Sequence, residues 1–265
     1  MQPEKLKDEE FLNRLRDYHA DVFVIASYGK ILPQALLDIP LHGTINVHPS
    51  LLPRYRGPSP IQSVILNGDK KTGVTLMLTD EKMDHGSILA QQEWESPISN
   101  IKFPTLYNEL ASLGGAMLVE TLPKWIAREI TPKEQSHEQA TFTKLFIKED
   151  GHIDWSKSAL EIDRMVRALN PWPGTWSLSE AKPPTFGGFA SESKRVKILA
   201  GYPSDEAALG PPGTLFETKS GQLGAASGDG TYVITKLQVE GKKEINGETF
   251  LMQGIPGDIM GIILS

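Results

Sequence analysis

Residues 21–50 read DVFVIASYGKILPQALLDIPLHGTINVHPS, and this stretch decides the fold class. The apolar run over residues 21–26 is typical of a parallel strand that is covered on both faces. Residues 33–38 predict a short helix with proline at its start, and residues 44–48 predict a second strand that ends before Pro49. A helix between two strands indicates an α/β domain.

The elements on either side extend this α/β pattern. Residues 8–19 place apolar side chains at helical spacing behind three carboxylates, which predicts an amphipathic helix ahead of the first strand. The patterns further along predict a helix, two paired strands and a long helix, over residues 59–67, 74–79, 88–95 and 103–128. We expect Gly114 and Gly115 to weaken the long helix.

The second half of the chain has a different character. Residues 129–141 are polar and aperiodic, which is the composition of a linker between domains. A helix over residues 158–168 and four short strands follow, the strands over residues 196–199, 213–217, 221–225 and 232–238. Short strands between Gly, Pro and Ser clusters favour a small β-barrel or sandwich. We therefore expect an α/β domain, a linker and a β-rich domain, over residues 1–128, 129–141 and 142–265.

Composition excludes several classes of protein. The 265 residues include no Cys, which removes disulfides, thiolate metal sites and cysteine nucleophiles. No apolar run approaches the roughly 18 residues of a membrane span, and the charged residues 1–8 do not resemble a signal peptide. We therefore expect a cytoplasmic protein that does not contact a membrane. A net charge of -6 argues against indiscriminate nucleic-acid binding, so any RNA contact must be local.

Two polar side chains on the second strand are candidates for chemistry. Residues i and i+2 of a strand face the same way, so Asn46 and His48 aim an amide and an imidazole at one point near the strand's carboxyl end. The amide can donate to an oxyanion and the imidazole can move a proton, while Asp84, in a Gly-containing loop, can orient His48. The spacing also fits a strand-capping Asn46 and a core His48, and it does not decide between the two interpretations.

A longer motif surrounds these residues. Residues 46–57 have the form Asn-x-His-Pro-Ser-Leu-Leu-Pro-x-x-Arg-Gly, and residues 84–86 add Asp-x-Gly. This signature resembles that of the tetrahydrofolate-dependent formyltransferases, and the resemblance covers nearly the whole chain. It implies a Rossmann-like catalytic domain followed by a small OB-like β-barrel domain. Four further segments resemble the members that formylate methionyl-tRNA, at residues 60–62, 153–155, 167–173 and 228–230.

The resemblance implies a reaction without a covalent enzyme intermediate and without a metal. The methionyl amine attacks the formyl carbon of 10-formyltetrahydrofolate, a co-substrate. Asn46 and a protonated His48 would stabilise the oxyanion, and Asp84 would support His48 and help the proton leave. The resemblance places the folate against Tyr28, Gly29, Lys30, Ile31, Leu32, Ser50, Leu51, Leu52, Pro53, Thr79, Asp80, Glu81 and Met83.

The implied partner is initiator methionyl-tRNA, bound by a monomer. The candidate RNA contacts are the basic residues Arg54, Arg56, Lys194, Arg195 and Lys197. Solvated arginines are an equally good interpretation of Arg54 and Arg56. Three aromatic residues could stack on bases, although core packing is the more common role: Trp155, Trp172 and Trp176. Ser50 beside His48 suggests a nucleophile, but a structural turn serine is favoured.

Other functions share the same three catalytic candidates. A formyltransferase that acts on an amino-sugar nucleotide and a 10-formyltetrahydrofolate hydrolase module are the alternatives within the family. Family members begin with further β and α elements before the helix of residues 8–19, roughly 60 residues if two βα units are involved. The resemblance thus implies an N-terminally incomplete catalytic domain, and we expect this chain to be a poor catalyst. The alternative from another class of protein is a non-catalytic remnant that binds folate or RNA.

Overall fold

The computed structural model describes residues 3–179, 193–253 and 263–265. The chain divides into two compact units. The first unit contains residues 1–64 and 69–145, and the second contains residues 65–68 and 146–265. No helix in the described ranges has both the length and the apolar composition that a membrane crossing requires.

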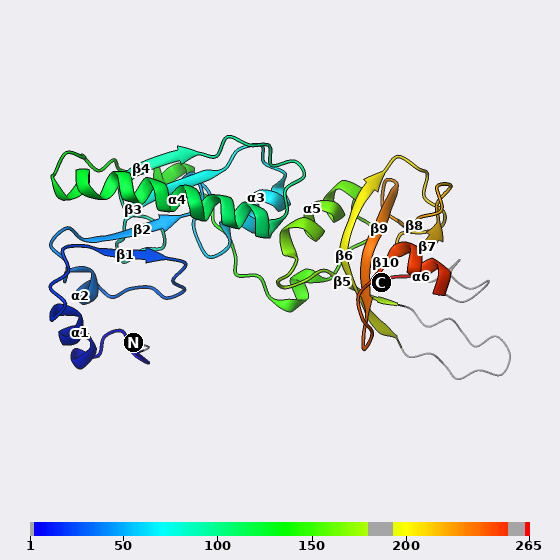
Figure 1. Ribbon diagram of the computed structural model, residues 1–265, viewed down its shortest axis with the longest axis horizontal. Coiled ribbons are helices and arrows are strands. Elements are labelled where there is room, and N and C mark those ends of the chain that lie inside the picture. Colours follow the sequence, from blue (N-terminus) through cyan, green and yellow to red (C-terminus); the bar gives the residue numbers. More distant parts are fainter. Residues whose placement is uncertain (1–2, 180–192, 254–262) are drawn as a thin grey trace. The chain divides into compact units, whose positions relative to one another are not determined.

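The first unit is built on a four-stranded sheet in the order β1-β2-β3-β4 (Figure 1). Its strands are β1 (Phe23–Ala26), β2 (Thr44–His48), β3 (Gly73–Leu78) and β4 (Ile88–Glu93). β1 and β2 are parallel, as the α/β pattern predicts, whereas β3 is antiparallel to both β2 and β4. The strand pair predicted after the helix of residues 59–67 is therefore confirmed as a β-hairpin.

Four helices accompany this sheet. They are α1 (Glu9–Arg16), α2 (Gln34–Leu37), α3 (Pro60–Asn67) and α4 (Phe103–Ile126). The side chain of Asp8 caps α1 by accepting a hydrogen bond from the Phe11 N–H. The apolar faces of α1 and α2 meet in a small core, in which Leu12 and Leu36 are buried and against which Phe23 and Ile25 of β1 pack.

The structure corrects one expectation about β1. A strand covered on both faces was predicted, but its residues alternate between half-buried and exposed, and Val24 is 44% exposed. Phe23 and Ile25 point to the core formed with α1 and α2, while Val24 points to the other face. Within the described residues β1 pairs with β2 alone. The apolar run therefore predicted the strand correctly, but the prediction that both of its faces are buried was wrong.

The long helix α4 corrects a second expectation. It runs unbroken across the sheet and through the Gly114-Gly115 pair (Figure 1). A Cβ at position 114 would lie 2.6 Å from Val47 Cγ1 and 3.4 Å from Val74 Cγ1, whereas one at position 115 would meet nothing within 4 Å. Gly114 thus allows α4 to approach the strand that carries Asn46 and His48.

The second unit is a six-stranded antiparallel sheet in the order β5-β6-β9-β8-β7, with β10 beside β9. Its strands are β5 (Trp176–Ser179), β6 (Lys194–Ser204), β7 (Leu215–Glu217), β8 (Leu223–Ala226), β9 (Thr231–Val239) and β10 (Ile245–Asn246). Helices α5 (Ala159–Leu169) and α6 (Gly247–Gln253) accompany it. Ser158 and Glu161 form a capping box at the start of α5, close to the predicted boundary. The core of the second unit includes Ile162, Ile198 and Tyr232. The expected β-rich domain is therefore confirmed.

Candidate active site

Strand β2 brings the two sequence candidates to the wall of one cavity. Asn46 and His48 both line a cavity of about 380 Å³ in the first unit, a size typical of small-molecule sites. Val47 between them faces the opposite way, toward Gly114 of α4. His48 is only 4% exposed, so its imidazole operates largely away from water.

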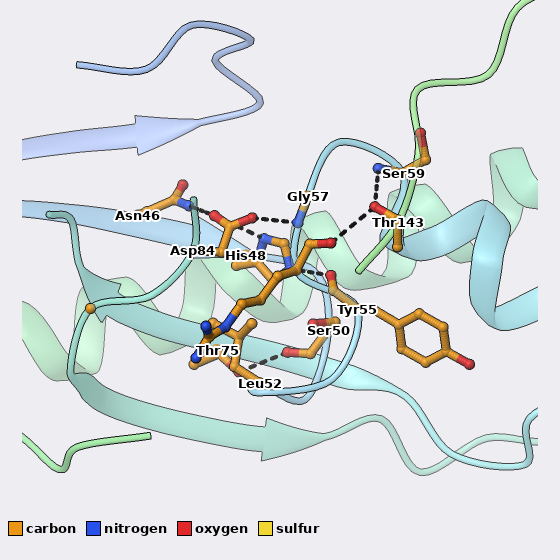
Figure 2. Close-up of polar contacts among 12 residues, drawn as sticks. Asn46, His48, Ser50, Leu52, Tyr55, Gly57, Ser59, Thr75, Asp84 and Thr143 are labelled. Carbon is orange, nitrogen blue, oxygen red and sulfur yellow. Dashed lines mark hydrogen bonds and ion pairs between the residues drawn. The ribbon is translucent and has the colours of Figure 1, made fainter. Parts of the chain in front are cut away.

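Asp84 joins these residues from the loop between β3 and β4. Its carboxylate accepts a hydrogen bond from Asn46 Nδ2 at 3.2 Å and another from the Gly57 N–H at 2.7 Å (Figure 2). Its Oδ1 also lies 3.6 Å from His48 Nδ1. Asp84 has a φ of 46°, a conformation that is uncommon for a residue with a side chain. The structure therefore assembles the three predicted catalytic residues.

The hydrogen bonds of His48 define its protonation pattern. Nε2 lies 2.9 Å from the Tyr55 carbonyl oxygen, which can only accept, so Nε2 carries the proton. Burial lowers the pKa of His48 below its ordinary value, and the Asp84 carboxylate and the Tyr55 carbonyl oppose that change. This direction differs from the expected protonated His48: burial favours a neutral ring whose Nδ1 can accept a proton.

Residues 133–143, which we call the strap, hold the two loops that face β2. Lys133 pairs with Ile88 at the start of β4, and Phe142 pairs with Arg56. Thr141 Oγ1 accepts from the Tyr55 N–H at 2.8 Å. The strap overlaps the predicted linker of residues 129–141 and belongs to the first unit, so this polar segment contributes to the geometry of the site.

Comparison with known proteins supports the same interpretation. Residues 1–122 match the family described as formyl transferase, and residues 146–254 match the formyl transferase C-terminal domain. The chain belongs to the formyl transferase family. It is 45% identical to the methionyl-tRNA formyltransferase of Roseiflexus castenholzii (strain DSM 13941 / HLO8) over 244 residues. The matched region covers 92% of this chain and 74% of that relative.

Solved structures with low sequence identity share the formyl transferase fold. One is HypX from Aquifex aeolicus in complex with tetrahydrofolic acid, with a TM-score of 0.67, 20% identity, and coverage of 92% of this chain and 41% of that chain. Another is a sugar N-formyltransferase from Shewanella sp FDAARGOS_354, with a TM-score of 0.57, 22% identity, and coverage of 71% and 76% respectively. At these identities the likeness bears on the fold alone.

Most of the predicted folate residues of this formyl transferase line the same cavity as Asn46 and His48. They are Tyr28, Gly29, Lys30, Ile31, Leu32, Thr79, Asp80 and Met83. Glu81 lies at a neighbouring cavity instead. The sequence interpretation missed Lys82 and Leu145, which also line the main cavity. Lys82 lies in the loop already predicted to contact folate and could have been added to that set. Leu145 lies beyond the predicted linker, and no sequence pattern indicated that it lines the cavity.

The structure places Ser50, Leu51, Leu52 and Pro53 away from the cavity lining, contrary to the expectation that they contact folate. Ser50 is fully buried, and its hydroxyl donates to the Arg54 carbonyl at 2.7 Å. The buried Leu52 donates its N–H to Thr75 Oγ1 at 3.2 Å. These residues form a turn packed beneath β3, which supports the structural interpretation of Ser50 over the nucleophilic one.

The two predicted RNA-binding arginines of the first unit differ. Arg54 has an exposed side chain that pairs with Asp69 at 2.9 Å. Arg56 is 3% exposed, and its guanidinium donates to Gln135 Oε1 and bonds to His137 Nδ1. An RNA contact needs an accessible guanidinium, so the structure contradicts that prediction for Arg56.

The basic cluster of the second unit lies at the start of β6. Lys194, Arg195 and Lys197 are all exposed there. The Arg195 guanidinium lies over the Trp176 ring, 4.2 Å from its centroid. Trp155 is buried as the core interpretation predicts, whereas Trp172 is 55% exposed. Among the described residues of both units, no group of three or more His, Asp or Glu side chains is placed to hold a metal ion.

Proposed function

We propose that this formyl transferase moves the formyl group of 10-formyltetrahydrofolate to the amino group of methionyl-tRNA. The observation that carries the proposal is the juxtaposition of Asn46, His48 and Asp84 at one wall of the cavity. The 45% identical methionyl-tRNA formyltransferase supports the choice of acceptor, because the sugar N-formyltransferase is only 22% identical. We expect a monomer that acts in the cytoplasm.

The cavity has the chemical character that a folate requires. Its lining combines apolar side chains, including Ile31 and Leu32, with the polar groups of Thr79 and Asp80. Pockets for ring-bearing ligands typically have this composition, in which apolar walls hold the ring and a few polar groups fix its orientation. The folate supplies a formyl carbon that forms a new C–N bond with the acceptor amine while the C–N bond to its N10 breaks.

Asn46 stabilises the charge that develops during this transfer. The formyl oxygen becomes an oxyanion when the amine attacks, and a fixed N–H donor lowers the energy of that state. The Asn46 amide carries two protons, of which one is donated to Asp84. The other remains for the oxyanion. Asp84 thus orients the amide without taking both of its protons.

His48 moves the proton that the amine must lose. Because Nε2–H is donated to the Tyr55 carbonyl, Nδ1 is the nitrogen that can accept. The amine proton passes to Nδ1 as the new C–N bond forms and is then delivered to N10 as the old bond breaks. The transient imidazolium lies 3.6 Å from the Asp84 carboxylate, which stabilises it. Atoms and charge balance, and the enzyme returns to its starting state.

A formylation assay with this 265-residue chain tests the proposal. Charged initiator tRNA and 10-formyltetrahydrofolate should give formylmethionyl-tRNA, and His48→Ala should abolish most of the product. The rate should fall as the pH is lowered through the pKa of His48, below the ordinary value of 6.5, because Nδ1 must be unprotonated. Preferential formylation of an amino-sugar nucleotide, release of formate without an acceptor, or no product with any acceptor would overturn the proposal.

A further inference from the structure

A buried amide on the strap grips the loop that carries Asp84. Gln135 is 5% exposed, and its Nε2 donates to the carbonyl oxygens of Asp84 at 3.0 Å and Gly86 at 2.8 Å. These two carbonyls flank His85, so one side chain fixes the backbone on both sides of it. Gln135 is not among the residues that line the main cavity, so its contribution to chemistry is indirect.

The other end of Gln135 is also fixed. Its Oε1 accepts from Arg56 Nε at 3.1 Å and Arg56 Nη2 at 2.7 Å. Backbone hydrogen bonds in both directions between Lys133 and Ile88, at 2.8 and 2.9 Å, set the register of the strap two residues earlier. Gln135 therefore joins the Asp84 loop to the loop that contains Gly57, whose N–H also binds the Asp84 carboxylate.

A second contact holds the same loop at His85, between the two carbonyls that Gln135 binds. The rings of His85 and His137 stack with centroids 4.0 Å apart and planes inclined by 4°. His85 Nδ1 lies 2.7 Å from Asp80 Oδ2, and His137 Nδ1 lies 2.8 Å from Arg56 Nη2. The stack shows that the strap and the loop are packed together over several residues, with Gln135 at the position nearest to Asp84.

The backbone conformation of Asp84 explains why the Gln135 hydrogen bonds are needed to hold its position. A residue with a side chain at a φ of 46° is in a sparsely populated region, which costs on the order of 1 kcal/mol or more unless its surroundings enforce it. If the Gln135 donors are lost, two carbonyls lose their partner and the loop can relax. The carboxylate would then leave the positions from which it orients Asn46 and faces His48 (Figure 2).

We propose that Gln135 is a positioning residue for formyl transfer, acting through Asp84. The inference rests on the proposed function, because it assigns Gln135 a part in the same reaction. Its amide protons hold the Asp84 backbone, and its oxygen is held in turn by Arg56. A residue in this role alters turnover and the charge environment of His48 without altering the groups that contact substrate.

Two substitutions separate the functions of the amide, and a third is a matched control. Gln135→Leu removes both the donors and the acceptor, while Gln135→Glu keeps an acceptor for Arg56 and removes the donors. Gln139→Leu makes the same change at an exposed position of the strap. We expect kcat to fall roughly 10- to 100-fold in both Gln135 variants, with KM for the tRNA little changed, because small misplacements of catalytic groups have effects of that size. Gln139→Leu should match the wild type.

Titration of His48 by NMR supplies a readout that does not depend on turnover. Asp84→Asn removes the carboxylate charge and should lower the His48 pKa, because Asp84 raises that pKa. The size of this decrease is the reference for the other variants. Gln135→Leu, which adds no charge, should shift the His48 pKa in the same direction, and Gln139→Leu should not. The proposal is overturned if the His48 titration in folded Gln135→Leu equals that of the wild type while Asp84→Asn shifts it. A wild type that forms no product would refute the proposed function, whereas this titration would still decide the role of Gln135.

Discussion

Strand β2 and the loop between β3 and β4 place the proposed catalytic groups by different means. Asn46 and His48 share a face because a strand repeats every two residues, and their neighbours in the sheet fix them. Asp84 stands in a loop with a φ of 46°, and its position depends on hydrogen bonds from Gly57 and Gln135, far from it in the chain. The shared face of Asn46 and His48 follows from a local period of the strand, whereas the position of Asp84 in its loop depends on residues far away in the chain.

The largest effects should come from the catalytic groups themselves, whichever way each is positioned. We expect Asn46→Ala, His48→Ala and Asp84→Ala each to reduce turnover by on the order of 100-fold or more, since loss of one oxyanion donor alone has that effect. Turnover is measured by formylation of charged tRNA, and thermal unfolding should show that the variants remain folded. Near-normal turnover of His48→Ala would contradict the role assigned to His48. Near-normal turnover of Asp84→Ala would show that the loop between β3 and β4 supplies no catalytic group.

A substitution in the facing loop tests how strictly the long-range contacts act. Gly57 has a φ of 107°, and a Cβ there would lie 2.9 Å from both the carbonyl oxygen and Oγ1 of Thr143. Gly57→Ala should therefore displace the N–H that binds Asp84, with strain of about 1–3 kcal/mol and a loss of turnover of roughly 5- to 100-fold. Gly115→Ala, in open space, is the control. Equal turnover of the two variants would show that the loop tolerates displacement.

The matching test of the strand side concerns stability. Because a Cβ on Gly114 would lie 2.6 Å from Val47 Cγ1, Gly114→Ala should lower the free energy of unfolding by about 1–3 kcal/mol through overpacking. Gly115→Ala should leave stability unchanged or raise it by up to about 1 kcal/mol, since Ala is the better helix former. Urea unfolding of both variants measures the difference. If the two behave alike, α4 does not restrain β2.

The smallest effect on turnover should come from substitutions in the second unit, whose residues are far along the chain from β2 and from the Asp84 loop. Replacing the basic cluster with Ala, at Lys194, Arg195 and Lys197, should weaken tRNA binding and reduce the slope of log affinity against log salt by up to about 3, or about 1 for each phosphate contact. Folate affinity should stay the same, since the cavity lies in the first unit. An unchanged salt slope would exclude this cluster from the RNA interface and favour Arg54.

The sequence predicted what local patterns control. The two-residue period of β2 identified Asn46 and His48. The helices predicted to start at residues 8 and 158 begin one residue later in the structure, where Asp8 and Ser158 cap them. Residues 50–53 carry the family motif but do not line the cavity, because a motif shared by a family does not separate residues that contact a ligand from residues that shape the turn beneath it. The burial of the Ser50 hydroxyl against a carbonyl is a property of the folded turn alone.

Gln135 illustrates what local patterns cannot supply. It stands in the polar segment TPKEQSHEQ, which has neither helical nor strand periodicity and is typical of a linker. Its importance comes from partners about 50 and 80 residues away, whose positions depend on the complete first unit. The same holds for Arg56, whose charge predicts a solvated or RNA-bound side chain, while its burial reflects the amide and imidazole that enclose it.

The strap also determines where this molecule can be recombined. A boundary drawn where composition changes, at residue 128, would keep Asn46, His48 and Asp84 together in one module. That module would nevertheless lack the Gln135 donors and the threonine hydroxyls that secure the loops around them. A chimera that joins this first unit to a different second unit should therefore be fused after Leu145, where the compact unit ends. The catalytic unit therefore includes the polar segment whose composition is typical of a linker.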